Sequence, residues 1–528
     1  MSLKTAFLRF IGACTFMCIA PAILYSQNNE SVFEKYRQSI DSRFEEIRSN
    51  NDKVFEGYRD RMNQEFSSYL DREWEKTTLS KAIPNPFRPE PKPIIDNTPQ
   101  QESRPLPHAE PVVIPEPLQH PKPIEPIPSR PIDPIQVLSD NDNVIIPDDE
   151  EAAIVQETPE HQPEIPEDGN RLSFSYLGNI CSVRIPKTKE ISIPSASNKE
   201  VSNAWNILSS ERYNDLLVDC ICIRKSLCLC DWAFYEFSLT LTEAYFGDKR
   251  SNESVALQVY IMSQLGYKIR LAKQENQLFA LISFEERLFS APYLSIDGDY
   301  FYCFSGNTKE GWIQICDFQF PGEQSCTVRM SHLPIAPINN TNQKTIKSDR
   351  YSLAAARVSV NKNLVDFYDN YPACSWEILA AASLSQNVKD QLYPSLRKAI
   401  ANQSQSQSAS ILLNFVQTGF EYQTDDDQFG REKSFFGDET FYYPYCDCED
   451  RSILYSILVR DLLGLDVVLL DYPTHIATAV NFTETVKGDY FDIDGKIYVI
   501  CDPTYIGAPI GKSMPEMMSL KANILRIK

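Results

Sequence analysis

The sequence predicts an α+β fold, in which a helix packs on an antiparallel sheet, behind an N-terminal extension of different character. The first observation is a helical pattern that begins at Cys448 and ends at Gly464, a residue type that commonly terminates helices. The second is a pair of strand-like segments, "HIATAVNF" and "GKIYVICD", each preceded by a turn signal. The third is an earlier stretch, residues 250–304, with the same order of patterns.

Length and charge limit the classes of protein to consider. The chain has 528 residues, which is enough for two or three domains. Its formal net charge is −21 and its pI is about 4.8. Because an acidic chain repels polyanions, we expect no nucleic-acid partner. The hydrophobic share of 42% is sufficient for folded cores.

Residues 1–26 have the pattern of a signal peptide. Lys4 and Arg9 precede the apolar run "FIGACTFMCIAPAILY", and Ser26 is a small residue suited to cleavage. An uncleaved anchor and a lipoprotein site at Cys14 are the alternatives. After this segment no run approaches the ~18 apolar residues that a membrane span needs. We therefore expect an exported protein of the periplasm or cell envelope, with secretion also open.

A long amphipathic helix with an eleven-residue repeat is predicted over residues 28–80. Its apolar residues recur in two series, Phe33, Phe44, Phe55, Phe66 and Tyr36, Ile47, Tyr58, Tyr69. A repeat of eleven keeps the apolar stripe nearly straight along a helix. Two interpretations stay open: the stripe packs on the body of the same chain, or residues 31–74 associate with a second copy.

Residues 81–168 are predicted to form a disordered, acidic linker. Twenty-one of the 35 prolines lie between Pro84 and Pro166. Proline-rich segments favour the extended polyproline II conformation and act as semi-rigid spacers. Spacing is therefore the expected role, and docking of a peptide-binding partner is the alternative.

A first folded domain is predicted over residues 170–345, with strands in its first part, residues 171–230. That part ends in "LLVDCICIRKSLCLCDW". On a hairpin it would place four cysteines as two same-face pairs: Cys220, Cys222, Cys228 and Cys230. Buried apolar positions explain them, and a zinc site is the alternative. The cysteine spacing along the chain predicts no particular disulfide pairing.

The second predicted domain, residues 350–528, holds a cysteine suited to nucleophilic chemistry. Cys448 lies at the start of a helix, where unpaired backbone N–H groups and the helix dipole favour a thiolate. Glu449 and Asp450 are common residues at helix starts, but their charges oppose a thiolate. Cys448 therefore needs a cationic partner.

Two histidines, His332 and His475, lie in sequence that is predicted to fold. His332 stands in a loop-like stretch, whereas His475 begins a strand 27 residues after Cys448. Asp502 follows another strand, a further 27 residues along. This order suits a triad with Cys448 as nucleophile, His475 as base and Asp502 as the group that fixes the ring tautomer.

On these residues the C-terminal region resembles the transglutaminase-like superfamily, which shares its core with papain-type cysteine proteases. The family pattern is C-x-D-x-[AS] at a helix start, a strand histidine and D-P-T. This chain has "CEDRS" from Cys448, then His475, then "DPT" from Asp502. The upstream "NFVQTGFEYQTDDDQFG" also resembles bacterial members. A motif that starts at Cys446 fails, so the match selects Cys448. Asp447 departs from the family, which has a small residue there.

The resemblance implies an oxyanion hole with two donors. The backbone N–H of Cys448 is one candidate, and the second is open among Gln417, Gln428 and Tyr442. This chemistry uses side chains only, so we expect neither a cofactor nor a metal. A metal site is the alternative, although it lacks a histidine ligand pattern. Its ligands would be Cys446, Asp447, Cys448 and Asp450.

Residues 250–304 align with the second domain without its chemistry. "LGYKIRLAKQENQLFALISF" matches "LGLDVVLLDYPTHIATAVNF" without a gap, and "SIDGDYFYCF" matches "DIDGKIYVIC" after a slip of one residue. Gln277 then takes the place of His475, Arg250 and Ser251 lie near that of Cys448, and Ser305 lies near that of Asp502. We predict a duplicated papain-like core with a degenerate first copy, and chance similarity is the alternative.

These features together predict an exported thiol enzyme that transfers an acyl group of a protein or peptide substrate through a thioester at Cys448. Hydrolysis of a peptide or amide bond is the first expectation, and transfer to an amine, as in transglutaminases, is the second. A non-catalytic binding or scaffold protein is the rival class. The linker, the aromatic helix, the degenerate first copy and the acids around Cys448 support it.

Overall fold

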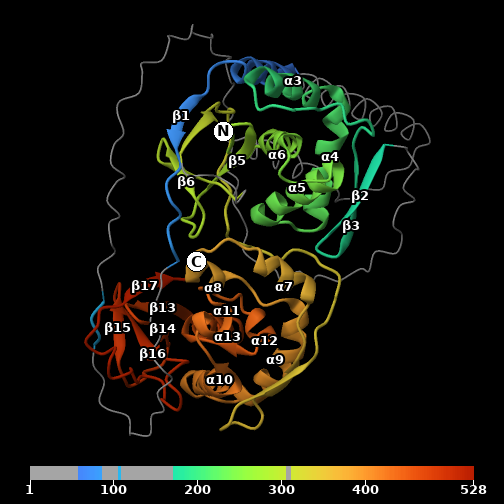
Figure 1. Ribbon diagram of the computed structural model, residues 1–528. Coiled ribbons are helices and arrows are strands. Elements are labelled where there is room, and N and C mark those ends of the chain that lie inside the picture. Colours follow the sequence, from blue (N-terminus) through green and yellow to red (C-terminus); the bar gives the residue numbers. More distant parts are fainter. Residues whose placement is uncertain (1–56, 86–104, 109–169, 305–310) are drawn as a thin grey trace, which may run out of the picture. The chain divides into compact units, whose positions relative to one another are not determined.

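The computed structural model describes residues 57–85, 105–108, 170–304 and 311–528 (Figure 1). All of these residues belong to one compact unit. The predicted signal peptide, the first part of the predicted helix and most of the linker lie outside the described residues. Within the described part, no helix is long and apolar enough to cross a lipid bilayer.

The first sheet has six antiparallel strands in the order β1-β8-β4-β5-β7-β6. They are β1 (Glu75–Thr78), β4 (Ile269–Gln274), β5 (Gln277–Phe284), β6 (Tyr293–Ile296), β7 (Asp299–Tyr302) and β8 (Trp312–Cys316). The helices of this part are α3 (Asn198–Leu208), α4 (Asn214–Ser226), α5 (Asp231–Phe246) and α6 (Asn252–Gln264). Helix α6 packs on β4 and β5. Every residue from Ser254 to Ser263 is buried, which is typical of a helix enclosed on all sides.

The second sheet has five antiparallel strands in the order β15-β16-β14-β13-β17. They are β13 (Asp466–Tyr472), β14 (His475–Asn481), β15 (Tyr490–Ile493), β16 (Lys496–Cys501) and β17 (Asn523–Arg526). The helices of this part are α7 (Lys362–Asp369), α8 (Trp376–Ala381), α9 (Gln386–Ile400), α10 (Gln405–Gly419), α11 (Asp425–Phe429), α12 (Glu439–Tyr442) and α13 (Cys448–Leu463). Helix α13 contacts β13 and β14 on one side and α8 and α10 elsewhere (Figure 1).

Tight turns join the last hairpin of each sheet. Asp494 and Gly495 connect β15 to β16, and both have positive φ, 53° and 78°. Asp297 and Gly298 connect β6 to β7 with φ of 51° and 91°. Two successive residues with positive φ match the twist of an antiparallel hairpin, and Asp-Gly is a sequence that tolerates them. The turn signals in the sequence therefore predict these hairpins correctly.

The two sheets agree in chain order and in strand order. Without β1, the first sheet runs β8-β4-β5-β7-β6, and the second runs β17-β13-β14-β16-β15. Each set of strands follows a buried helix, α6 in one case and α13 in the other. The structure therefore confirms the α+β class with antiparallel sheets.

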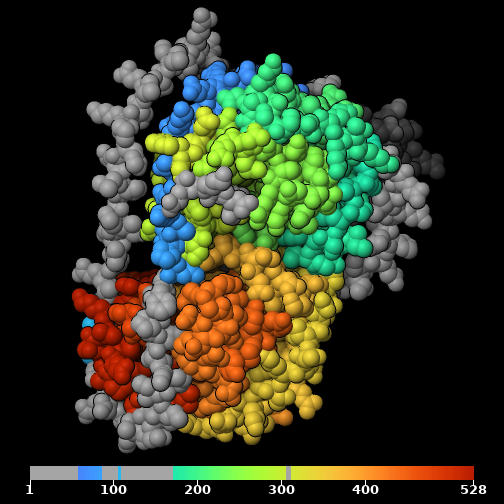
Figure 2. Space-filling view, viewed as in Figure 1, coloured from blue at the N-terminus to red at the C-terminus, as the bar shows by residue number. Residues whose placement is uncertain are grey.

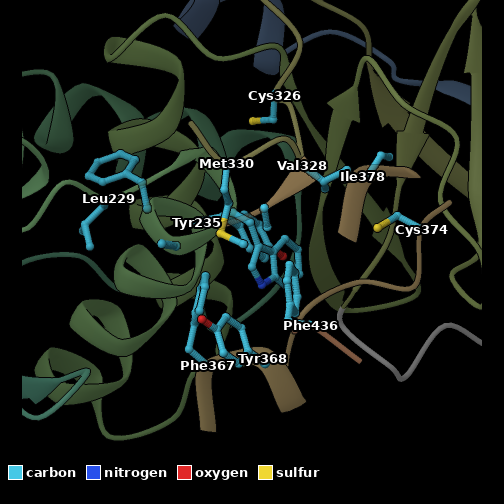
Figure 3. Packing of buried hydrophobic residues seen from close by; sticks show 14 of the residues in the cluster. Leu229, Tyr235, Cys326, Val328, Met330, Phe367, Tyr368, Cys374, Ile378 and Phe436 are labelled. Carbon is cyan, nitrogen blue, oxygen red and sulfur yellow. The ribbon is translucent and has the colours of Figure 1, made fainter. Parts of the chain in front are cut away.

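One large cluster of buried side chains extends through both parts of the compact unit. Figure 3 shows a section of this cluster, in which Val328 of the first part lies beside Ile378 of the second. A second cluster covers the other face of the second sheet, where Phe491 and Met514 are buried. The second sheet is thus buried on both faces, which fixes the strands that carry the predicted site.

Part of the sequence prediction for residues 171–230 is wrong. Only β2 (Arg171–Tyr176) and β3 (Asn179–Arg184) are strands, and α3 and α4 follow them. The cysteine hairpin does not form, since Cys220 lies within α4 and Cys230 precedes α5. In α4, Leu216, Leu217 and Cys220 are buried at helical spacing, whereas Val218 and Cys222 are exposed. The alternation of residues in this segment resembles that of a strand, but the segment forms a helix.

The predicted helix over residues 28–80 ends earlier than expected. The described helical residues are 57–70, and the chain then turns and enters β1, which pairs with β8. This segment, 57–85, lies on the surface in Figure 2. Phe66 is buried against Trp205, with ring centroids 4.4 Å apart, so the end of the aromatic stripe packs on the same chain. Residues 31–56 lie outside the described residues, and self-association stays a prediction.

The structure differs from the predicted domain organisation at two places, one inside the linker and one at the break between the two domains. Within the linker, Leu106 is buried against the second sheet, and its N–H donates to Tyr490 O at 2.8 Å. The predicted domain break at residues 345–350 falls on β9 (Lys344–Lys347), which pairs with β10 (Ala355–Val358). Helix α10 packs on β9, so this hairpin belongs with the second part of the chain.

Candidate active site

Cys448 is the first residue of α13, as the sequence predicts. Asp447 is the N-cap residue, and the helix ends at Gly464 in the left-handed conformation. Each residue from Cys448 to Val459 is buried. Since α13 is packed on all sides, the position of its first turn relative to the sheet is fixed.

Ser452 links the start of α13 to the strand that carries His475. Its hydroxyl donates a hydrogen bond to Ile476 O at 3.1 Å. Residues four apart lie on the same face of a helix, so Cys448 lies above Ser452 on the face toward β14. Ile476 directly follows His475, the first residue of β14. This bond therefore holds the first turns of α13 beside the start of β14, the strand that His475 begins.

His475 and Asp502 form a buried pair. The Nε2 atom of His475 lies 2.9 Å from Oδ2 of Asp502. The other carboxylate oxygen, Oδ1, accepts hydrogen bonds from the backbone N–H groups of Thr504 and Tyr505, at 2.9 and 3.2 Å. Nε2–H then donates to Asp502, and this tautomer leaves a lone pair on Nδ1. Nδ1 is buried and has no hydrogen-bond partner among the described residues.

The ring of Tyr472 supports the imidazole of His475. Tyr472 is the residue opposite His475 in the β13–β14 hairpin. The two rings are nearly parallel, at 15°, with centroids 6.4 Å apart. Tyr472 therefore lies beside the imidazole, whose hydrogen-bonded partner is Asp502.

Gln417, a candidate oxyanion donor, holds the loop after β16. Its side-chain amide donates to the carbonyl oxygens of Asp502, Tyr505 and Ala508, at 3.0, 2.8 and 3.2 Å. Its Oε1 atom accepts from Gly507 N–H at 3.3 Å. The amide is buried and its bonding capacity is taken up by this loop. The geometry therefore favours a positioning role, in which Gln417 fixes the backbone that carries Asp502.

The other two oxyanion candidates lie on neighbouring segments. Gln428 bonds to the backbone of Tyr445 through both ends of its amide, at 3.2 and 3.4 Å. Tyr442 is the last residue of α12, and its carbonyl oxygen accepts from Lys344 Nζ at 2.5 Å. Neither contact involves the thiol or the imidazole, and the second oxyanion donor stays a prediction.

The thiol of Cys448 donates to a carboxylate. Its Sγ atom lies 3.0 Å from Oε2 of Glu449. Asp447, on the other side of Cys448, is completely buried. Burial raises the pKa of the Asp447 carboxyl well above its usual range, and the charge of Glu449 adds to this. The acids that the sequence shows around Cys448 therefore face inward.

Asp450 has a structural role at the start of α13. Its two carboxylate oxygens accept from the backbone N–H groups of Phe435 and Asp447, at 2.9 and 3.2 Å. Burial, followed by the charge of Asp425, raises the pKa of Asp450 well above its usual range. The acid of the C-x-D-x-[AS] pattern thus fixes the helix start and the preceding loop.

Cys446 differs from Cys448 in its surroundings. It lies in β12 (Tyr445–Cys446), which pairs with β11 (Glu421–Tyr422). Its thiol contacts Glu421 O at 3.7 Å. Burial raises the pKa of Cys446 to about 11. Cys446 therefore lies in a short strand pair and not at a helix start, and the choice of Cys448 as the nucleophile stays a prediction.

Sequence reasoning missed Asp425 and the positioning roles of Ser452 and Gln417. Ser452 occupies the small-residue position of the motif, but only the structure shows that its hydroxyl reaches β14. Asp425 begins α11 and lies close to the carboxylates of Asp447 and Glu449. The run "TDDD" is a weak signal for such an acid, because Asp426 and Asp427 in the same run are exposed.

Comparisons of the chain with protein-family models, with curated proteins and with solved structures find no match. Its function must therefore be argued from the residues of the site.

Proposed function

We propose that the chain is an exported thiol enzyme that hydrolyses a peptide or amide bond of a protein or peptide substrate in the cell envelope, with Cys448, His475 and Asp502 as its triad. The observation that carries the proposal is the His475–Asp502 pair at 2.9 Å, with an unpartnered Nδ1 on the imidazole. An imidazole held in this way can accept a proton at Nδ1, and the nearest predicted nucleophile begins the adjacent helix.

The reaction follows the general scheme of thiol acyl transfer. His475 Nδ1 takes the thiol proton, and Cys448 Sγ forms a bond to the substrate carbonyl carbon. The C–N bond then breaks, and the imidazolium returns the proton to the leaving amine, which gives a thioester. Water attacks the thioester, releases the carboxylic acid and restores the thiol. Asp502 stabilises the imidazolium that forms in each half of the cycle.

A transglutaminase reaction would share the first half of this cycle. In that case the acyl donor is a glutamine side chain, ammonia leaves, and a primary amine attacks the thioester. The triad does not distinguish water from an amine as the acceptor, since both react at the same carbon.

The rival proposal is a non-catalytic binding protein, and one observation favours it. Cys448 is 1% exposed, and its thiol donates to Glu449 instead of presenting an open sulfur. A nucleophile enclosed among carboxylates must be released before it reacts. The two proposals therefore differ in whether substrate can reach Cys448.

We also propose that the two helix–sheet units arose by duplication and that the first unit has lost its chemistry. The shared strand order supports this proposal, as do the two Asp-Gly hairpin turns at matching places. The first helical residue of α6 is Asn252, and the first residue of β5 is Gln277. Ser305, which the alignment places near Asp502, lies outside the described residues.

The test is an acyl-transfer assay with the full chain and an unfolded protein substrate, in water alone and with hydroxylamine or a fluorescent primary amine. New peptide ends indicate hydrolysis, and hydroxamate or bound amine indicates transfer. Cys448→Ala should abolish all products, and Cys446→Ala is the matched control. Equal product yields from wild type and Cys448→Ala would contradict the enzyme proposal.

A further inference from the structure

Three buried carboxylates from two separate segments meet beside the start of α13. Asp425 comes from α11, and Asp447 and Glu449 flank Cys448. One oxygen of each lies within 4.8 Å of the others. All three residues are at most 3% exposed. Like charges this close repel strongly in a buried site unless a positive charge or a proton joins them.

Asp447 shows that the cluster is not completed by the protein itself. Both of its carboxylate oxygens are buried and make no hydrogen bond of normal geometry among the described residues, although the side chain faces the backbone N–H of Asp450 in a capping-box arrangement. A buried carboxylate without donors is costly, and such a group in a native fold indicates a further partner such as an ion. One of the two oxygens lies within 4.8 Å of a carboxylate oxygen of Asp425 and of Glu449.

The nearby basic side chains are engaged elsewhere. Lys433 pairs with Glu439 and Asp369, at 2.6 and 3.1 Å. Arg451, which follows Asp450, donates to the carbonyl oxygens of Gln417 and Phe420. In the part of the chain that the structure describes, no lysine, arginine or histidine forms an ion pair with Asp447 or Glu449. No basic side chain of the described residues therefore neutralises Asp447 or Glu449, so a bound proton or an external cation must do so.

We propose that Asp425, Asp447 and Glu449 bind a divalent cation that prefers oxygen ligands, with Ca²⁺ as the best fit. Ca²⁺ binds oxygen at about 2.3–2.6 Å, so oxygens up to roughly 4.8 Å apart can share one ion. A set of carboxylates without histidine selects against the softer metals. Water and backbone carbonyl groups would complete the coordination, as is common for Ca²⁺.

Cation binding also has a consequence for Cys448. Glu449 Oε2 is the atom that now accepts from the Cys448 thiol. A cation that draws Glu449 toward Asp425 and Asp447 would release the thiol and offset the negative charge around it. The binding site itself does not rest on the proposed function, because none of its ligands belongs to the triad.

The test is calcium titration of the full chain after removal of metals with a chelator. Isothermal calorimetry should detect a single saturable site, and the melting temperature should rise with Ca²⁺ and fall again with the chelator. Asp447→Asn should weaken binding by about tenfold or more. Asp426→Asn removes an exposed carboxylate of the same helix, α11, and should bind Ca²⁺ as wild type does. Cys448→Ala should also retain binding, which separates this proposal from the enzyme proposal.

Three results would contradict the proposed Ca²⁺ site. Wild type could show neither heat nor a change in melting temperature with Ca²⁺, which would mean that the carboxyl groups share protons instead. Asp447→Asn could bind as tightly as wild type, which would place the ion elsewhere. Zn²⁺ binding that depends on Cys448, without Ca²⁺ binding, would indicate a different ligand set. If Asp447→Asn does not fold, the wild-type titration and Asp425→Asn decide the question.

Discussion

The two helix–sheet units of this chain have the same strand order but different residues at the helix start. In the first unit, Asn252 begins α6 and Gln277 begins β5. In the second, Cys448 begins α13 and His475 begins β14. The alignment of sequences placed Arg250 and Ser251 near Cys448, and the structure shifts that position to Asn252, since α6 starts two residues later than the ungapped alignment implies.

At the helix start of the first unit, the polar side chains bond to each other and to the backbone. Asn252 Oδ1 accepts from Leu278 N–H at 2.8 Å and from Gln277 Nε2 at 3.3 Å. Gln277 Nε2 also donates to Arg250 O at 2.7 Å. The second unit leaves His475 Nδ1 without a partner. The same architecture therefore holds a pair of hydrogen-bonded amides in the first unit and an imidazole with an unpartnered nitrogen in the second. Only the imidazole is suited to accept a proton.

The largest effect on activity is expected from substitution at the start of α13, and none is expected from substitution at the start of α6. Cys448→Ala should reduce acyl transfer by about 10³-fold or more, because the covalent intermediate cannot form. Asn252→Ala should leave the rate per folded molecule unchanged but lower stability by about 1–3 kcal/mol, because it leaves the Leu278 N–H unsatisfied. The assay above and urea unfolding measure the two quantities. A loss of activity in folded Asn252→Ala would break the distinction between the units.

The next largest effect is a loss of rate when Asp502, the hydrogen-bond partner of the His475 imidazole, is replaced. Asp502→Asn should keep the fold but lower the rate by about 10²–10⁴-fold, since the amide permits the wrong tautomer of His475. The same assay measures the rate, and near-ultraviolet circular dichroism checks the fold. A folded Asp502→Asn variant with wild-type activity would show that the pair at 2.9 Å has no catalytic role.

A smaller effect tests the positioning role of Gln417. Gln417→Ala should lower the free energy of unfolding by about 2–4 kcal/mol, because it leaves buried carbonyl groups of the Asp502 loop without a donor. Gln428→Ala is the matched control, since that amide bonds only to the backbone of Tyr445 at the surface and should cost less than about 1 kcal/mol. Equal losses in urea unfolding would remove the special role of Gln417.

The smallest effect lies in the first unit and depends on pH. Burial raises the pKa of Glu236, in α5, to about 8. The folded state then holds a proton on Glu236 that the unfolded state has lost above its ordinary pKa of about 4.5. Stability should therefore fall as pH rises from about 4.5 to 8. Glu236→Gln should raise the free energy of unfolding at pH 9 by about 1–2 kcal/mol and change little at pH 4.

The control for this prediction is Glu243→Gln, an exposed glutamate of the same helix. It should change stability by less than about 0.5 kcal/mol at either pH. Thermal unfolding at pH 4 and pH 9 compares the variants. A pH-independent effect of Glu236→Gln would contradict the raised pKa of Glu236.

Local signals in the sequence predicted the second unit well. Gly464 ends α13, Asp494 and Gly495 form the hairpin turn, and Cys448 begins a helix as expected. These features depend on a few adjacent residues with strong conformational preferences. The structure also brings His475 and Asp502 together, as their order along the chain suggested.

Features that depend on distant contacts were not predictable. The strand β1 forms because β8, more than 200 residues away, provides its partner. The segment of α4 resembles a strand because its cysteines alternate with other residues in "DCICI", whereas its burial follows helical spacing. The roles of Gln417 and Asp425 depend on loops that fold back from other parts of the chain. Tertiary contacts decide such cases, and a single sequence does not display them.

The most direct test of the central claim is the rate at which iodoacetamide alkylates Cys448 between pH 4 and 9, followed by mass spectrometry in wild type and His475→Ala. Cys446 is the internal control, because its pKa of about 11 keeps it unreactive over this range. An ordinary thiol reacts appreciably only near pH ~8.5. The proposed pair predicts reaction of Cys448 near pH 5 that His475→Ala removes. The same profile for Cys448 in both proteins, rising only at alkaline pH, would contradict the pair and favour the binding protein.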